Sequence, residues 1–216
     1  MDLATPGARA AKLFIGGLAG VALIAGIVER SASPWTSAWS TAVQRPVGGD
    51  GEDDGAGGDW SRKGFSDQSV RQIVRASAGG ERVRIRLSNV YGTRPLRVAA
   101  ATVGRAGGGA AVWPESIRDV TFGRTASAVV PAGREAVSDP VPVPVSPMEG
   151  LAVTLRFTDP TGPATFHRFA AATSYRAPGD HLADTAAGAF SESSGSWYYL
   201  SGVEVAGRPP ADLPDL

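Results

Sequence analysis

The stretch ERVRIRLSNVYG, residues 81–92, alternates apolar and charged side chains. Val83, Ile85 and Leu87 fall on one side of an extended chain and the arginines between them on the other, because successive side chains of a strand point to opposite faces. A helix would scatter these apolar residues around its circumference, and β-branched side chains suit a pleated surface. The stretch therefore predicts a half-buried strand, with one face in the core, the other in water, and turns at both ends.

Two other segments show the same alternation. Residues 68–77 place three apolar side chains on one face and Arg71, Ile73 and Arg75 on the other. Because Gly79 and Gly80 tolerate a tight turn, this segment is predicted to form a hairpin with residues 81–92. Residues 151–158 repeat the pattern. The predicted inward residues of the two segments are Val70, Val74, Ala76, Leu151, Val153, Leu155 and Phe157.

The rest of the chain reads as short strands separated by turns. Further strands are predicted within residues 35–42, 95–103, 119–123, 128–133, 164–175 and 196–205. The first carries Trp35 and Trp39, interpreted as core aromatics. Residues 141–145 alternate Val and Pro and are predicted to be an edge or an extended connector, because proline removes backbone donors. About nine or ten short antiparallel strands without an amphipathic helix predict an all-β fold, a β-sandwich or jelly-roll-like domain.

The two ends of the chain differ from this central region. Residues 1–34 contain Arg9 and Lys12 ahead of the apolar run 13–28, a pattern typical of a secretory signal peptide. An uncleaved membrane anchor and a buried core helix are the alternatives. Signal and anchor both place the domain of residues 35–205 outside the cytoplasm, secreted or held at the membrane by this segment alone. Residues 206–216 are a proline-rich tail.

Composition excludes several classes of function. The 216 residues carry 21 basic and 21 acidic side chains and no cysteine. The balanced charge gives no field that would attract nucleic acid, and the absence of cysteine excludes disulfides, thiolate catalysis and cysteine-bound zinc. The stretch Asp50–Gly55 resembles the first half of a calcium loop, but Ser61 stands where the bidentate Glu belongs, so a solvated acidic loop is expected. No phosphate-binding loop is present, and no cofactor is predicted.

Neither of the two histidines has a recognisable catalytic or metal-binding context. His167 falls in a predicted strand and His181 in a turn, and the two do not have metal-ligand spacing. A triad of Ser174, His167 and Asp180 would lack the Gly-x-Ser-x-Gly turn that exposes a serine nucleophile. No catalytic residue is predicted.

Several segments together resemble the N-terminal region of secreted bacterial hydrolases of the SGNH/GDSL family, a group of esterases and lipases. The matching segments are residues 35–39, 68–75, 83–92, 130–133 with 138–139, and 165–167 with 173–175. The block Arg86-Leu87-Ser88-Asn89-Val90-Tyr91-Gly92 is the most specific, and the resemblance covers residues 35–205. It implies a β-sandwich that precedes an α/β domain carrying the nucleophile.

The resemblance does not extend to the family's catalytic blocks. A Gly-Asp-Ser block is expected soon after Val205, where this sequence instead runs Ala206-Gly207-Arg208-Pro209-Pro210. The expected function is therefore a non-catalytic accessory domain of an ester hydrolase, with an SGNH catalytic domain as partner and an ester as substrate. The alternative is a stand-alone exported module that binds polysaccharide or cell wall through Trp60, Trp113 and Trp197 on loops.

Overall fold

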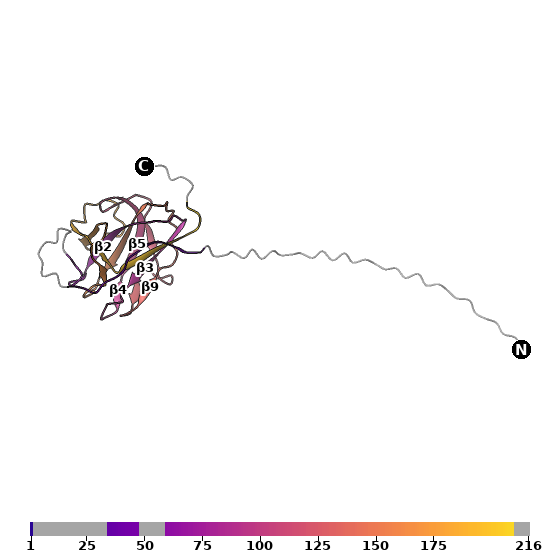
Figure 1. The fold of residues 1–216 in the computed structure, drawn as a ribbon, viewed down its shortest axis with the longest axis horizontal. Helices are drawn as coiled ribbons and strands as arrows, with labels where there is room; N and C mark the ends of the chain where they lie inside the picture. The colour runs from indigo at the N-terminus through magenta and orange to yellow at the C-terminus, as the bar shows by residue number, and fades with distance from the viewer. Residues whose placement is uncertain (2–33, 48–58, 210–216) are drawn as a thin grey trace. The chain divides into compact units, whose positions relative to one another are not determined.

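The computed structural model describes residue 1, residues 34–47 and residues 59–209, and the regular structure within them is β-strand (Figure 1). The N-terminal signal or anchor, the acidic stretch Asp50–Gly55 and residues 210–216 of the tail lie outside these residues. Within them, no helix is long and apolar enough to span a membrane.

Fifteen strands occur in the described residues. They are β1 (Thr36–Ser40), β2 (Gln68–Arg75), β3 (Arg82–Ser88), β4 (Leu96–Val98), β5 (Ala100–Gly108), β6 (Ala111–Val112), β7 (Arg118–Val120), β8 (Ala128–Val130), β9 (Glu135–Val137), β10 (Gly150–Phe157), β11 (Phe166–His167), β12 (Ser174–Pro178), β13 (Glu192–Ser194), β14 (Trp197–Tyr198) and β15 (Leu200–Ala206). The all-β prediction is confirmed.

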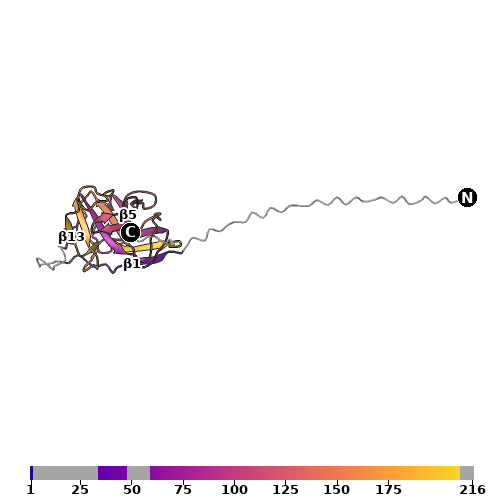
Figure 2. The same ribbon diagram turned by 90° about the horizontal axis from the view of Figure 1, so that it is seen from above.

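The strands form two larger sheets and two short pairs, and every pairing is antiparallel. The β3 sheet has four strands in the order β1-β15-β3-β9. The β2 sheet has seven, in the order β13-β12-β2-β10-β5-β6 with β7 also paired to β5. β11 pairs with β14 and β4 with β8, and one sheet curls as a half-barrel. β1 and β13 each lie at the end of their sheet (Figure 2).

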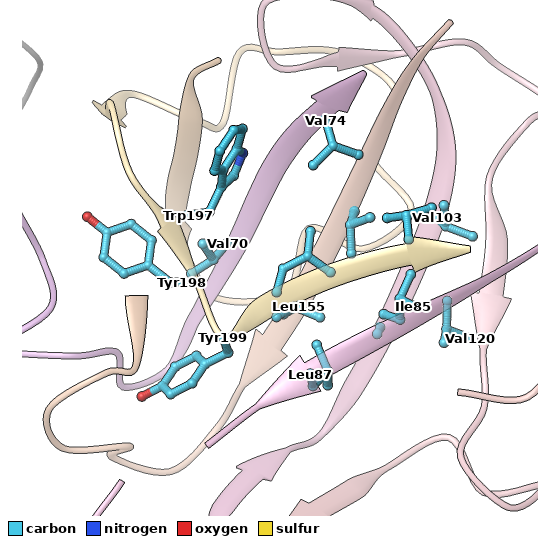
Figure 3. Packing of buried hydrophobic residues seen from close by; sticks show 14 of the residues in the cluster. Val70, Val74, Ile85, Leu87, Val103, Val120, Leu155, Trp197, Tyr198 and Tyr199 are labelled. Atoms are coloured by element: carbon cyan, nitrogen blue, oxygen red, sulfur yellow. The ribbon is translucent and has the colours of Figure 1, made fainter. Parts of the chain in front are cut away.

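The predicted core faces are confirmed. Val83, Ile85 and Leu87 of β3 are buried, and so are the odd-numbered residues from Leu151 to Phe157 of β10. Both sets belong to one apolar cluster, in which Ile85 and Leu87 face Leu155 and Val103 (Figure 3). In β3 the alternation identifies the buried face correctly, because a pleat has a period of two residues, whereas in β10 the residues on the other face, Ala152, Thr154 and Arg156, are buried as well.

The predicted hairpin between residues 68–77 and 81–92 is wrong. β2 pairs with β10 and β12, whereas β3 pairs with β15 and β9, so the two strands belong to different sheets. Gly79 and Gly80 carry the chain from one sheet to the other. At Gly80 an added Cβ would lie 2.9 Å from the carbonyl oxygen of Ala206. Glycine is needed here because the two backbones approach closely, and not because a hairpin turns at this point.

Three predicted strands each hold two observed strands, and β6, β9 and β13 lie where no strand was predicted, so the strands outnumber the predicted nine or ten. Residues 95–103 split at Ala99 into β4 and β5, which pair with different partners. Residues 196–205 split at Tyr199, whose φ of 60° lies in the left-handed region. Residues 164–175 hold only β11 and the start of β12. The prediction for residues 141–145 is confirmed: they are an extended connector in which Val141 forms an isolated bridge with Val83.

Only one of the first strand's two tryptophans packs on the core. β1 carries a bulge between Ser37 and Trp39, and Ala38 is its buried residue. Trp39 contacts Trp197 edge to face with the ring centroids 4.8 Å apart. Trp35 instead lies under the guanidinium of Arg84, 4.3 Å from it, on the outer side of the β3 sheet. The bulge disturbs the alternation that placed both rings in the core.

The outer face of the β2 sheet is also covered. Arg71 is fully buried and donates hydrogen bonds to Thr154 Oγ1 (2.9 Å) and to the carbonyl oxygens of Ala110 (2.7 Å) and Asp184 (2.8 Å). Its guanidinium lies 4.2 Å from the centre of the Phe190 ring. Burial lowers the pKa of Arg71 to about 10, although the nearby Asp184 opposes the shift. Through these contacts Arg71 holds residues 180–190 against the outer face of the β2 sheet.

Candidate functional site

Two of the three tryptophans predicted to bind a ligand are core residues. Trp60 is 5% exposed and stacks on Tyr198, with the ring centroids 5.4 Å apart. Trp197 is 7% exposed, and its indole N–H donates to the carbonyl oxygen of Ile73 at 2.8 Å. The prediction that both rings lie exposed is wrong, since both are buried in the apolar core and the indole N–H of Trp197 is paired there.

Trp113 is the predicted residue that remains accessible, with 38% of its surface exposed. It follows β6 and begins a turn that is fastened to β5 at Arg105. The Trp113 N–H donates to the Arg105 carbonyl oxygen, and the Arg105 N–H donates to Ser116 Oγ, both at 2.9 Å. Ser116 Oγ in turn donates to the Trp113 carbonyl oxygen at 2.7 Å. These bonds hold the backbone that carries the indole ring.

The turn Trp113–Ser116 has an unusual residue at its third position. The Ser116 N–H donates to the Trp113 carbonyl oxygen at 3.2 Å, Pro114 occupies the second position, and Glu115 has a φ of 67°. This is the arrangement of a type II turn, which favours Pro at the second position and glycine at the third. A glutamate in this backbone conformation is strained, and residues with strained backbones are found more often at functional sites.

Three charged side chains line the same cleft as Trp113: Arg105, Glu115 and Arg118. Arg105 forms an ion pair with Glu149. Arg118 donates through Nη1 to the carbonyl oxygens of Glu115 (2.5 Å) and Ile117 (2.9 Å). Within the described residues, the Glu115 carboxylate forms no ion pair and remains open to solvent. The cleft that Trp113 lines therefore also has an unpaired carboxylate and a guanidinium with N–H groups left to donate.

Two clefts meet at Trp113. One has a volume of about 360 Å³ and is lined by Arg105, Trp113, Pro114, Glu115, Ser116, Arg118, Pro142, Val143 and Pro144. The other has a volume of about 240 Å³ and is lined by Gly107, Ala111, Val112, Trp113, Pro114, Thr185 and Ala186. Trp113 and Pro114 belong to both linings, so they form the wall between the two clefts.

Sequence reasoning missed every polar residue of this site. Arg105 and Arg118 lie on neighbouring strands, and Pro142 and Pro144 come from the extended connector, so only the fold gathers them. One local signal was present. The sequence Trp113-Pro114-Glu115-Ser116 has proline where a tight turn favours it, with an aromatic residue directly before.

The histidines do not form a catalytic group. His167 Nδ1 lies 2.7 Å from the Ala42 carbonyl oxygen. His181 contacts Asp184 Oδ2 through Nδ1 and the Pro178 carbonyl oxygen through Nε2, both at 2.8 Å. Neither ring has a hydrogen bond to a serine hydroxyl, and the buried Ser174 Oγ has no hydrogen-bond partner in the described residues. The structure thus does not bring Ser174, His167 and Asp180 together as a triad.

Two buried tyrosines have raised pKa values. Burial raises the pKa of Tyr199 to about 12 and also raises that of Tyr198. Both phenols therefore stay protonated at neutral pH and act as core residues rather than as bases. No group of three or more His, Asp or Glu side chains in the described part of the chain is arranged to hold a metal ion.

Residues 86–92, the block that resembles the family most specifically, contain Asn89, which is hydrogen-bonded to several other segments. We call this group of hydrogen bonds the hub at Asn89. Asn89 Nδ2 donates to the carbonyl oxygens of Arg94 and Val130, both at 2.9 Å. The Asn89 carbonyl oxygen accepts from Gly133 N–H at 2.9 Å, and the Tyr91 N–H donates to Thr165 Oγ1 at 3.1 Å. Three of the resembling segments therefore meet at this hub.

Comparisons with known proteins found no relative. No protein-family model matches this chain, and no curated protein sequence matches it.

Proposed function

We propose that this chain is the non-catalytic N-terminal accessory domain of an SGNH/GDSL-type ester hydrolase, exported from the cytoplasm. The observation that carries the proposal is the hub at Asn89, where three of the segments that resemble this family are hydrogen-bonded to one another. Residues that are far apart in sequence and resemble one family are thus parts of one structural unit. The resemblance follows the scaffold of the domain and not a catalytic centre.

Within the all-β class, the architecture that we propose is a jelly-roll-like β-sandwich. The support is that the β3 sheet and the β2 sheet contribute to a single apolar cluster. Two antiparallel sheets that share a core by their inner faces are the basis of a sandwich. Such a domain presents a rigid surface beside a catalytic domain rather than a reactive group.

The accessory role also rests on the chemistry of the two histidines. Acyl transfer needs a base within hydrogen-bond reach of a nucleophile, and donors directed at the developing oxyanion. His167 and His181 instead have their ring nitrogens directed at backbone carbonyl oxygens and at Asp184. In the proposal, an SGNH catalytic domain supplies the nucleophile and the ester is its substrate.

The first test is the nucleotide sequence downstream of the Leu216 codon. The proposal expects an SGNH domain there, opening with a Gly-Asp-Ser block, in the same frame, another frame or a neighbouring gene. An unrelated gene would contradict it and favour the stand-alone exported binding module instead.

The second test is a binding measurement. The SGNH domain encoded there is produced separately and titrated with the full 216-residue chain by calorimetry. The expected result is saturable binding together with a change in the KM or kcat of the SGNH domain. If neither binding nor a kinetic change is seen, the proposal fails.

A further inference from the structure

We infer that the turn at Trp113 is a binding site for a chain of neutral pyranose sugars, which lies across the indole ring and occupies the cleft on each side. This inference goes beyond the accessory role, because it needs no catalytic domain. It rests on the exposed ring, the two adjoining clefts, the strained Glu115 and the fixed backbone of the turn.

The ring provides the stacking surface. The axial C–H groups of a pyranose form an apolar patch with a slight positive charge, which is attracted to the negative face of an aromatic ring. Trp113 is 38% exposed, whereas the other four tryptophans are buried or half-buried, and its backbone is hydrogen-bonded to Arg105 and Ser116. Because this backbone is fixed before binding, only the side-chain torsions of Trp113 lose freedom when the sugar stacks on the ring.

The clefts provide room for more than one sugar. Trp113 and Pro114 separate a hollow of about 360 Å³ from one of about 240 Å³. In the larger one, the outward-facing Pro142 and Pro144 stand on either side of the buried Val143. A ligand that crosses the ring reaches both hollows, so a linear oligosaccharide fits better than a single sugar.

The polar side chains favour hydroxyl groups over charges. Glu115 offers two acceptor oxygens, and Arg118 retains N–H donors on Nε and Nη2 beyond those directed at backbone carbonyl oxygens. A planar acceptor and a planar donor match neighbouring hydroxyl groups of a sugar. Arg105 is paired with Glu149, so the larger cleft has no surplus of cations that would select an anion.

The strained Glu115 supports a role for its side chain. Glycine would adopt the φ of 67° without strain, yet this turn carries a glutamate. Glu115 lines the larger cleft together with Trp113. A binding role explains why a strained, unpaired side chain stands at this position.

Two other ligands fit less well. Grooves that bind proline-rich peptides are lined by several aromatic rings, whereas Trp113 is the single aromatic residue in the lining of either cleft. Single-stranded nucleic acid needs a cationic track beside the stacking ring, and here Glu115 and the pairing of Arg105 offset the positive charge.

The test is affinity electrophoresis of the full chain in gels containing hydroxyethylcellulose, xylan, mixed-linkage β-glucan or galactomannan, with polygalacturonate as the acidic comparison. The expected result is retardation by at least one neutral polysaccharide. Trp113→Ala should weaken it at least tenfold, Trp113→Phe should retain part of it, and Glu115→Gln should weaken it severalfold. The control is Phe169→Ala, which removes an exposed aromatic ring outside both clefts and should not change it.

A fluorescence measurement on the wild-type chain keeps the proposal testable even if Trp113→Ala fails to fold. Iodide quenches exposed indole rings, and a hexasaccharide of the retarding polysaccharide should protect Trp113 from it. Trp113→Phe should abolish this protection.

Three outcomes overturn the inference: no retardation by any neutral polysaccharide, equal retardation of folded Trp113→Ala, or retardation by polygalacturonate alone. None of them bears on binding to an SGNH domain, so failure of this site and failure of the accessory role are distinguishable.

Discussion

Glu115 occupies a backbone conformation that favours glycine, with a φ of 67°. A non-glycine residue in such a conformation costs about 1–3 kcal/mol, part of which glycine gives back through the greater entropy of the unfolded chain. We expect Glu115→Gly to stabilise the protein by about 1 kcal/mol, measured by urea unfolding. Glu115→Ala is the control, because it removes the carboxylate but keeps the strained backbone. If the alanine variant gains as much as the glycine variant, strain is not the cause.

Gly92 is required by its neighbour Asn89. A Cβ at residue 92 would lie 1.8 Å from Asn89 Oδ1, and the Asn89 side chain is held by two carbonyl acceptors. In Gly92→Ala the amide must move and leave both acceptors, which should cost about 2–3 kcal/mol of unfolding free energy.

Gly188→Ala is the matched control for this substitution, because an added Cβ there meets no atom within 4 Å. Its unfolding free energy should stay within about 0.5 kcal/mol of wild type. Equal values for the two variants would show that the hub at Asn89 does not constrain Gly92.

At the scale of the strand, a substitution in β3 tests which face of this strand is buried. Ile85 is 1% exposed and belongs to the core that the two larger sheets share. Ile85→Asp would bury an unpaired carboxylate, at a cost of several kcal/mol, comparable to the roughly 5–15 kcal/mol that stabilises a domain. We expect the variant to be unfolded or insoluble by circular dichroism and expression.

The control for Ile85→Asp places the same charge on the outward side of another strand. Val129 of β8 is 55% exposed, so Val129→Asp should fold as wild type does. Soluble, folded Ile85→Asp would contradict the register derived for β3.

The outer face of the β3 sheet holds a cross-strand charge cluster. Glu204 of β15 stands directly opposite Arg84 of β3 and also pairs with Arg86. Burial acts to raise the pKa of Glu204, but the hydrogen bonds from Arg84 and Arg86 outweigh it and hold the pKa below its ordinary value of 4.5. Because the folded pKa is the lower one, the stabilisation is present above pH 4.5 and is lost as the pH falls through the folded value.

This cluster predicts a difference in acid stability. Glu204→Gln should lose about 1 kcal/mol at pH 7 and show a smaller decline in unfolding free energy between pH 5 and pH 3 than wild type. Glu135→Gln is the control, since its carboxylate lies 3.8 Å from Arg86 and is 42% exposed. Parallel pH profiles for Glu204→Gln and wild type would count against the assignment.

At the scale of the whole molecule, the accessory role predicts that the chain alone does not hydrolyse esters. A nucleophile, a base and oxyanion donors must act together, and each missing element removes orders of magnitude of rate. The purified full chain should show no saturable turnover of p-nitrophenyl acetate or butyrate above background. His167→Ala and His181→Ala are assayed beside it. Saturable turnover that either substitution abolishes would reveal a catalytic site within this domain.

The alternation of side chains was enough to assign an all-β fold and the buried faces of its long strands. Val83, Ile85 and Leu87 could be assigned to the core because a side chain's face depends only on its position along the pleat. The prolines in residues 141–145 could likewise be used to predict an edge or an extended connector, because the loss of a backbone N–H donor depends only on the residue itself.

Strand partners and the covering of outer faces depended on tertiary structure. β3 pairs with β15, more than a hundred residues away, and the two glycines after β2 fit either a hairpin or a crossing between sheets. The alternation places Arg71 on the outward face of β2, yet its side chain is fully buried because residues 180–190 cover it.

The same contrast between local sequence and tertiary structure holds for the candidate site. The turn at Trp113 was not predicted, although Pro114 is a residue that favours the second position of such a turn. Which of Trp60, Trp113 and Trp197 remains exposed is not visible in the sequence, because burial depends on which distant strands pack against each ring. The sequence by itself determined which residues face the core along β2, β3 and β10. The tertiary structure decided which strands pair and which tryptophan stays exposed, because both depend on contacts between residues far apart in the chain.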